Sequence, residues 1–149
     1  MSNPPDRQAL IGKRIAVLDY GDARIGVAVC DEMHIVVSTR PAIENRQDTV
    51  WDELEKRLHD DRVDVVMVGV PWLEDGRITP IIERIGVFVE EFKKRIPISV
   101  YEIDESFSTK RAFEVMRSSG MRKQQRHAKG KKDEVAAAVL LRDFLEGTL

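Results

Sequence analysis

The sequence contains a single cysteine, Cys30, and only three histidines among its 149 residues. A lone cysteine excludes an internal disulfide, and the scattered His34, His59 and His127 do not have the spacing of a zinc site. No apolar run reaches the roughly 18 residues that a membrane-spanning helix needs, and the start of the chain lacks the apolar segment of a secretory signal. We therefore expect a cytoplasmic protein without a zinc site or a membrane partner.

The net charge of the chain is also small, because 24 Lys and Arg nearly offset 26 Asp and Glu to leave −2. A nucleic-acid-binding domain commonly has a basic excess, so the net charge taken alone argues against a polyanionic partner. With 42% hydrophobic residues, a chain of this length can bury roughly two-thirds of its unfolded surface in one fold. We expect a flexible leader at residues 1–12, which are polar and contain proline, and a single domain at 13–149.

The first part of the chain alternates strand-forming runs with short turns. Residues 14–19 and 24–31 are rich in apolar and β-branched residues, and the turn-like residues 20–23 separate them. A third extended stretch at 34–39 follows closely. These features predict an antiparallel three-stranded meander.

Helices and strands alternate along the remainder of the chain. Apolar residues at helical spacing predict helices, and two apolar runs predict strands. In chain order the expected elements are a helix at 47–60, a strand at 63–69, a helix at 79–94, a strand at 98–103, a helix at 108–119 and a last helix that opens at Asp133. The near-continuous apolar character of 63–69 indicates a strand buried on both faces. We therefore expect an α/β fold in which the meander and parallel strands form a mixed five-stranded sheet with helices on both faces.

Acidic residues occupy three places that this topology brings together. Asp19 ends the first strand, Asp104 and Glu105 end the fifth, and Asp133 opens the last helix. The carboxyl ends of parallel strands share one edge of a sheet, so these carboxylates are expected to converge there. Converging carboxylates need a neutralising cation, and hard oxygen ligands suit Mg²⁺ or Mn²⁺, which can support phosphodiester hydrolysis. Each acid taken alone also fits a structural role, as a turn residue, a solvated loop residue or a helix cap.

A basic segment at residues 117–132 precedes the last of these acids. It contains seven Lys or Arg and no acid, so the remainder of the chain carries a charge of −9. These residues are Arg117, Arg122, Lys123, Arg126, Lys129, Lys131 and Lys132. The segment lacks apolar periodicity, which predicts a mobile loop, and it is either merely solvated or faces an anionic partner. Phosphate backbone is the expected partner, so the small net charge conceals a candidate nucleic-acid-binding segment.

Four ordered blocks of the sequence resemble the signature of a known family. They are residues 17–31, 68–76, 104–109 and 133–141, and in order and spacing they are similar to the four signature blocks of the YqgF/RuvX family. The resemblance extends over about residues 13–146. It implies an RNase H-like fold similar to that of the RuvC resolvase, and a bacterial cytoplasmic nuclease. Members are described as Holliday-junction resolvases and as nucleases that process the 5′ end of the small-subunit ribosomal RNA precursor.

The resemblance also places functional residues on this chain. The Asp of the family's first strand falls on Asp19, the Glu of its Asp-Glu-Arg block falls on Glu105, and the Asp of its last helix falls on Asp133. These are the places that the topology indicates. Further signature positions are Arg24, Gly26, Gly69, Pro71, Asp75, Gly76 and Thr109. We interpret the glycines and the proline as residues that shape turns near the site.

The sequence departs from the family pattern next to Glu105. Ser106 stands where the family usually has Arg, and Ser108-Thr109 stands where it has a Thr pair. A missing guanidinium removes a phosphate or carboxylate contact, which affects substrate positioning more than metal binding. Arg111 or the basic segment is expected to compensate.

The favoured hypothesis is therefore a metal-dependent nuclease that acts on structured nucleic acid, with 5′-end processing of pre-16S rRNA in ribosome biogenesis ahead of resolution of Holliday junctions. Asp19, Glu105 and Asp133 would be catalytic and would hold Mg²⁺ or Mn²⁺, while Arg24 and the basic segment would bind the backbone. The alternatives are a nucleic-acid-binding module without efficient catalysis, and a phosphotransferase similar to the actin-like sugar kinases. Against a kinase, 149 residues supply one lobe where those enzymes have two. A monomer and a homodimer both remain open.

Overall fold

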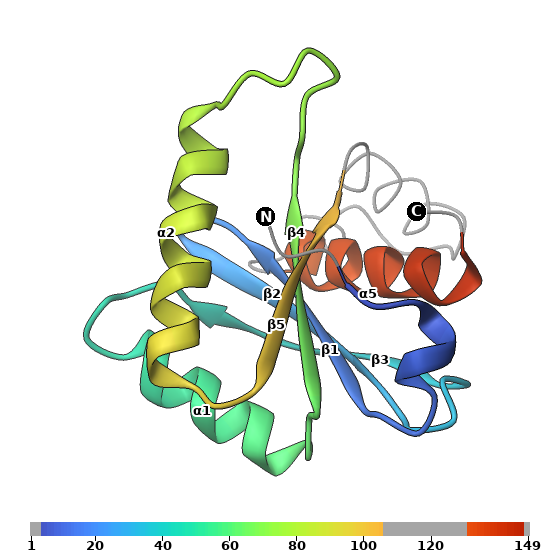
Figure 1. Ribbon diagram of the computed structural model, residues 1–149. Helices are drawn as coiled ribbons and strands as arrows, with labels where there is room; N and C mark the ends of the chain where they lie inside the picture. The colour runs from blue at the N-terminus through green and yellow to red at the C-terminus, as the bar shows by residue number, and fades with distance from the viewer. Residues whose placement is uncertain (1–3, 106–130, 148–149) are drawn as a thin grey trace.

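The computed structural model describes residues 4–105 and 131–147 of the chain (Figure 1). These residues form a five-stranded sheet with the strand order β3-β2-β1-β4-β5. The elements in chain order are the 3₁₀ helix η1 (Arg7–Leu10), β1 (Ile15–Tyr20), β2 (Arg24–Cys30), β3 (Val37–Glu44), α1 (Val50–Asp60), β4 (Val65–Val70), α2 (Pro80–Arg95), β5 (Ser99–Asp104) and α5 (Lys131–Glu146). None of the described helices is long and apolar enough to cross a membrane.

The pairing of the strands confirms the predicted mixed sheet. β2 runs antiparallel to both β1 and β3, which makes the first three strands a meander. β4 runs parallel to β1 and to β5, so these three strands end at the same edge. Every residue of β4 is buried, as expected for a central strand covered on both faces. This arrangement confirms the predicted α/β fold with a mixed five-stranded sheet.

Helices cover both faces of the sheet, and alternate residues of β1 enter two separate cores. Ala16 and Leu18 pack in a core with α1 and α2. Ile15 and Val17 pack in a second core with α5, which lies across β1, β2 and β3 (Figure 1). The period-2 alternation of a strand explains this division.

Aromatic side chains fix the end of β1 on the α1/α2 face. Tyr20 lies 5.1 Å from Phe88 between ring centroids, and Trp51 stacks on the same Phe88 at 5.1 Å. Because Tyr20 packs toward α1 and α2, its neighbour Asp19 lies on the opposite face, toward α5. The packing of one hydrophobic core thus orients a carboxylate toward the other face.

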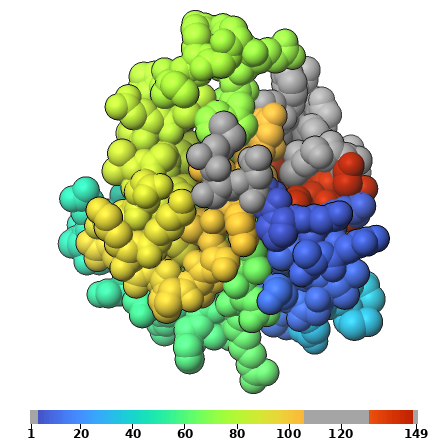
Figure 2. Space-filling model, viewed as in Figure 1, coloured from blue at the N-terminus to red at the C-terminus, as the bar shows by residue number. Residues whose placement is uncertain are grey.

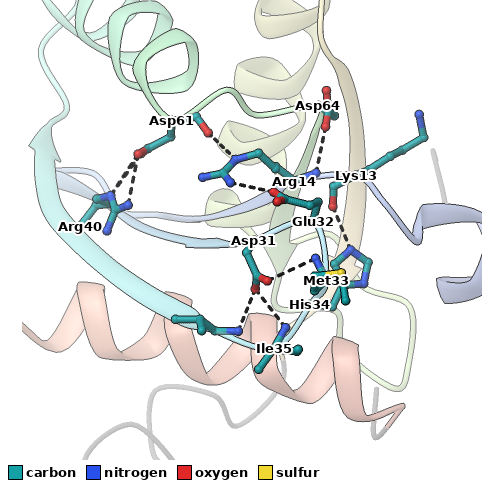
Figure 3. Close-up of polar contacts among 11 residues, drawn as sticks. Lys13, Arg14, Asp31, Glu32, Met33, His34, Ile35, Arg40, Asp61 and Asp64 are labelled. Carbon is teal, nitrogen blue, oxygen red and sulfur yellow. Dashed lines mark hydrogen bonds and ion pairs between the residues drawn. The ribbon is translucent and has the colours of Figure 1, made fainter.

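The third strand begins and ends later than predicted, at Val37–Glu44 instead of 34–39. The Asp31 carboxylate accepts hydrogen bonds from the backbone N–H groups of Ile35 and Val36, which hold the preceding residues in a turn (Figure 3). At its other end β3 continues through Pro41. An edge strand tolerates this proline because its N–H would face away from the sheet. β2 and β3 also change register near Gly26, where β3 carries one more residue than β2.

The predicted helices and strands otherwise appear with small shifts at their ends. α2 begins at Pro80 because the Thr79 hydroxyl caps it by accepting a hydrogen bond from the Ile82 N–H at 3.3 Å. The last helix begins earlier than predicted, with Lys131 and Lys132 already in its first turn. The helix predicted at 108–119 lies outside the described residues.

The segment before β1 contains structure within the region expected as a flexible leader. Residues Arg7–Leu10 form η1, and Leu10 is buried in the α5-side core. At the other end of the sheet, the loop between β4 and α2 projects beyond the strands, at the top of the space-filling view (Figure 2). Its turn at Gly76 requires φ +77°, a conformation that favours glycine.

Candidate active site

The candidate site lies at the edge where β1, β4 and β5 end. Asp19, the penultimate residue of β1, is paired in register with Gly26 of β2. Glu105 directly follows β5, and its N–H donates to the Val70 carbonyl at 3.0 Å, which fixes the chain beside the end of β4. Asp133 lies in the first turn of α5. The structure therefore gathers carboxylates from three distant parts of the chain.

Gly26 brings the start of α5 onto the sheet. A Cβ atom at this position would overlap the carbonyl oxygen of Asp133 and lie 3.1 Å from the Asp133 Cβ. Only a residue without a side chain lets the helix approach the strand this closely. Because Gly26 is paired with Asp19, this approach places Asp133 beside the β1 carboxylate.

Gly69 performs the same role for the second carboxylate. A Cβ atom there would lie 2.6 Å from Glu105 Oε2 and 2.6 Å from Leu140 Cδ2. Gly26 and Gly69 both lie within strands, so the prediction that these glycines shape turns is wrong for them. Gly76 does lie in a turn, in which its N–H donates to the Leu73 carbonyl at 3.0 Å. The two strand glycines instead make room for the carboxylates.

Asp19 and Glu105 form a partly buried, hydrogen-bonded pair. Burial raises the pKa of Glu105 to about 10, and the charge of Asp19 and the hydrogen bond with it act in the same direction. Burial also raises the pKa of Asp19, although the hydrogen bond from Glu105 opposes this shift; the Asp133 charge raises that pKa further and the Lys132 charge lowers it. Because the hydrogen bond favours the ionised form of Asp19, we assign the shared proton to Glu105. The adjacent Asp104 is exposed.

Asp133 has a different partner. Its Oδ2 lies 3.6 Å from Nε of Arg24, and both side chains are mostly buried. The Arg24 Nε atom is buried and has no hydrogen-bond acceptor among the residues that the structure describes. Arg24, predicted to bind nucleic acid, therefore lies inside the carboxylate site as a counter-ion.

The donor set of the site fits a divalent cation in part. Two buried carboxyl groups that share one proton are hard oxygen ligands, and a bound cation would relieve the repulsion that the proton now relieves. Within residues 4–105 and 131–147, however, no three His, Cys, Asp or Glu side chains lie close enough to hold a metal ion together. The Asp19–Glu105 pair thus fits Mg²⁺ or Mn²⁺, whereas Asp133 would have to leave Arg24 to join it.

Most of the predicted backbone-binding residues cannot be placed. Arg117, Arg122, Lys123, Arg126 and Lys129 lie outside the described residues, as do Ser106 and Thr109. Lys131 and Lys132 belong to α5, not to a loop. Lys132 lies near enough to Asp19 to lower its pKa, so positive charge from the basic segment does reach the site.

The turn between β1 and β2 is held by residues that the sequence did not indicate. Asn45 donates from Nδ2 to the Gly21 carbonyl at 2.8 Å and from its backbone N–H to the Ala23 carbonyl at 2.9 Å. Arg84 of α2 donates to both oxygens of Asp22 at 2.8 and 2.9 Å. These long-range contacts fix the turn that links Asp19 to Arg24, and no local pattern could have revealed them.

A separate cavity lies on the α1/α2 side of the sheet. It has a volume of about 1260 Å³, and its lining includes Tyr20, Trp51 and Val87. None of the three candidate carboxylates lines it. The candidate site therefore rests on the carboxylates at the strand ends and not on this cavity.

Comparison with known proteins agrees with the sequence signature. The family model of RuvX, described as Holliday junction resolvase, matches residues 13–147. A relative from Flavobacterium johnsoniae, provisionally named pre-16S rRNA nuclease, is 37% identical over 133 residues, which cover 89% of this chain and 95% of that protein. A relative of the same name from Chlorobium luteolum is 36% identical over 137 residues, which cover 89% of this chain and 94% of that protein.

Among solved structures, Thermus thermophilus RuvC in complex with a Holliday junction substrate aligns with a TM-score of 0.48 and 14% identity, over 91% of this chain and 96% of that chain. The family assignment does not depend on this structure, because the family model spans most of the chain and the relatives match over nearly their whole length. The chain therefore belongs to the RuvX family.

Proposed function

We propose that this chain is a cytoplasmic, metal-dependent nuclease that hydrolyses phosphodiester bonds in structured nucleic acid, and that its substrate is the 5′ end of pre-16S rRNA. The observation that carries the proposal is the partly buried, hydrogen-bonded pair of Asp19 and Glu105, with Asp133 beside it. A chain gains no stability from burying carboxylates against one another, so such a pair indicates a functional site.

Each residue of the site has a defined task under this proposal. Asp19 and Glu105 would hold Mg²⁺ or Mn²⁺, with Glu105 giving up its proton, and Asp133 would complete the ligand set. The ion, when bound, supplies Lewis acidity at the scissile phosphate. Gly26 lets the backbone of Asp133 approach β2, and Gly69 leaves room for the side chain of Glu105. Arg24, Lys132 and the rest of the basic segment would bind the phosphate backbone, so affinity should fall as salt rises.

The choice of RNA substrate is supported by relatives that match nearly end to end. The Flavobacterium johnsoniae protein is provisionally named pre-16S rRNA nuclease, and this chain covers 95% of it. A DNA four-way junction is the second candidate, because the matching family model is described as Holliday junction resolvase. Backbone contacts and carboxylate chemistry serve both substrates, so a direct comparison has to separate them.

A cleavage assay tests the proposal. Purified wild type, Asp19→Asn and the control Asp48→Asn are incubated with Mg²⁺ and either a precursor-like 16S RNA, a four-way DNA junction or duplex DNA. Asp48 is an exposed carboxylate in the loop before α1. We expect cleavage of the RNA by wild type and by Asp48→Asn, and a loss of about 100-fold or more in Asp19→Asn.

The outcomes separate the alternatives. Cleavage of the junction in preference to the RNA would identify a resolvase. Binding of nucleic acid without cleavage by wild type would identify a binding module, and undiminished cleavage by Asp19→Asn would remove the carboxylate site from the chemistry.

A further inference from the structure

Two half-buried arginine–aspartate pairs in this fold differ in how they are bonded. Arg24 of β2 faces Asp133, and Arg40 of β3 faces Asp61; the arginine side chains are 30% and 33% exposed and the aspartates 21% and 18%. The two pairs therefore have nearly the same solvent exposure. They differ in geometry and in hydrogen bonding.

The Arg40 pair is fully hydrogen-bonded. Arg40 donates from Nε to both Asp61 oxygens, at 3.3 and 3.2 Å, and from a terminal nitrogen to Oδ1 at 3.2 Å (Figure 3). A fork of this kind fixes both side chains and gives a strong, directional contact. This pair has the geometry of a structural link between β3 and the end of α1.

The Arg24 pair is held by charge without that fork. The closest approach, from Nε to Asp133 Oδ2, is 3.6 Å, and the buried Nε finds no hydrogen-bond acceptor within the described part of the chain. A buried donor without an acceptor carries a desolvation cost that the ion pair only partly offsets. The contact between Arg24 and Asp133 is therefore weak, and Asp133 can exchange Arg24 for a partner that binds it better.

The position of Asp133 defines what that partner would be. The packing of α5 on Gly26 fixes the Asp133 backbone beside β1, and its charge already acts on the carboxyl group of Asp19. The Asp133 carboxylate can lie against the Arg24 guanidinium or against a cation on Asp19 and Glu105.

We propose that Arg24 is a positioning residue that holds Asp133 in the metal-free chain and is released when a divalent cation takes Asp133 as a ligand. The freed guanidinium then binds a phosphate of the nucleic acid. This inference rests on the proposed function, since it needs a metal at the carboxylates. By linkage, metal and nucleic acid each strengthen the binding of the other through Arg24.

Metal binding without nucleic acid gives the first test. Wild type, Arg24→Gln and the matched control Arg40→Gln are titrated with Mn²⁺ in a calorimeter. Loss of the competing ion pair should tighten Mn²⁺ binding by about 2- to 5-fold in Arg24→Gln and leave Arg40→Gln unchanged. Unchanged or weaker binding by Arg24→Gln would overturn the inference.

Linkage gives the second test, with a readout that a merely structural role would not move. Affinity for the precursor-like RNA is measured in the presence and in the absence of Ca²⁺, which replaces Mg²⁺ so that the RNA is not cleaved. A gel checks that the RNA stays intact. The gain in affinity that Ca²⁺ produces should shrink by at least about 2-fold in Arg24→Gln but not in Arg40→Gln. An equal gain in all three proteins would contradict the exchange.

A spectroscopic measurement on wild type covers the case in which Arg24→Gln does not fold. In an NMR titration of metal-free protein with Mg²⁺, the Nε–H resonance of Arg24 should shift while that of Arg40 stays in place. An Arg24 resonance that has not moved at metal saturation would overturn this inference but not the proposed function. If wild type binds no divalent cation, or Asp19→Asn binds it equally well, the proposed function fails as well.

Discussion

Two groups of carboxylates lie toward opposite ends of the sheet, and their pKa values shift in opposite directions. Just after β2, Asp31 accepts backbone hydrogen bonds from Val36 at 2.8 Å, Ile35 at 3.0 Å and Met33 at 3.2 Å (Figure 3). These N–H donors, that of Val36 foremost, hold the pKa of Asp31 below its usual range. Backbone N–H groups of the chain thus stabilise the negative charge of this carboxylate.

The pair of Asp19 and Glu105 is the opposite case. Burial raises the pKa of both groups, and a side-chain hydrogen bond joins them. A carboxylate with converging N–H donors shapes a turn, whereas carboxylates buried together keep their affinity for a proton or a cation. Acidic residues near strand ends can therefore have either role, and the surrounding donors decide which.

The largest expected effect on stability and cleavage comes from moving α5 away from the sheet beside the Asp19–Glu105 pair. Gly26→Ala places a methyl group where the Asp133 carbonyl lies, so the helix must move away from β2. We expect a loss of about 2–3 kcal/mol in the free energy of unfolding, measured by urea titration, and loss of most Mg²⁺-dependent cleavage.

Gly86→Ala is the matched control for this prediction. Gly86 lies inside α2 with open space around it, so alanine there should stabilise the chain by about 0.5–1 kcal/mol and leave cleavage unchanged. Equal stability of Gly26→Ala and wild type would show that α5 does not depend on close approach to β2.

The second prediction concerns the pH dependence of stability in EDTA. Because the folded state raises the pKa of Glu105 from 4.5 to about 10, its contribution to stability is complete below 4.5 and is lost as the pH rises toward 10. Wild type should therefore lose stability between about pH 5 and pH 8, and Glu105→Gln should lose less by at least about 1.4 kcal/mol, the equivalent of one pKa unit.

Urea titrations at several pH values measure this difference. Glu74→Gln, which removes an exposed carboxylate from the loop after β4, should keep the wild-type slope. A Glu105→Gln curve parallel to that of wild type would mean that the proton is held elsewhere.

The smallest effect is expected at Asp31, the carboxylate that accepts backbone hydrogen bonds. Asp31→Asn weakens the acceptors of the turn before β3, so the melting temperature should fall, by less than in Gly26→Ala, while cleavage stays within about 2-fold of wild type. Because the pKa of Asp31 is lowered in the folded state, its contribution to stability is complete above its ordinary value of 3.8 and is lost as the pH falls below 3.8 through the lower folded-state pKa. A pronounced loss of cleavage at neutral pH would contradict the contrast between the two groups.

The sequence alone predicted the five strands, the described helices α1, α2 and α5, and the edge at which acids gather. A short apolar run at 14–19, a near-continuous apolar run at 63–69 and helical spacing in α2 are local signals, and strand and helix formation respond to them. The predicted start of the third strand was wrong because the residues around Ile35 have high strand propensity. In the folded chain their backbone N–H groups instead donate hydrogen bonds to the Asp31 carboxylate. Propensity describes a residue, and a turn depends on partners.

The tertiary structure alone decided how the acids meet. The family resemblance distinguishes Glu105 from Asp104, but only the structure shows that Glu105 lies against Gly69 and forms a hydrogen bond with Asp19. Likewise, a basic residue after a turn gives no indication that Arg24 faces Asp133, over a hundred positions later. Composition and periodicity determine which residues form strands and helices, because those depend on neighbours in sequence; the chemistry of the site depends on contacts across the chain, which exist only once the sheet and α5 have packed together.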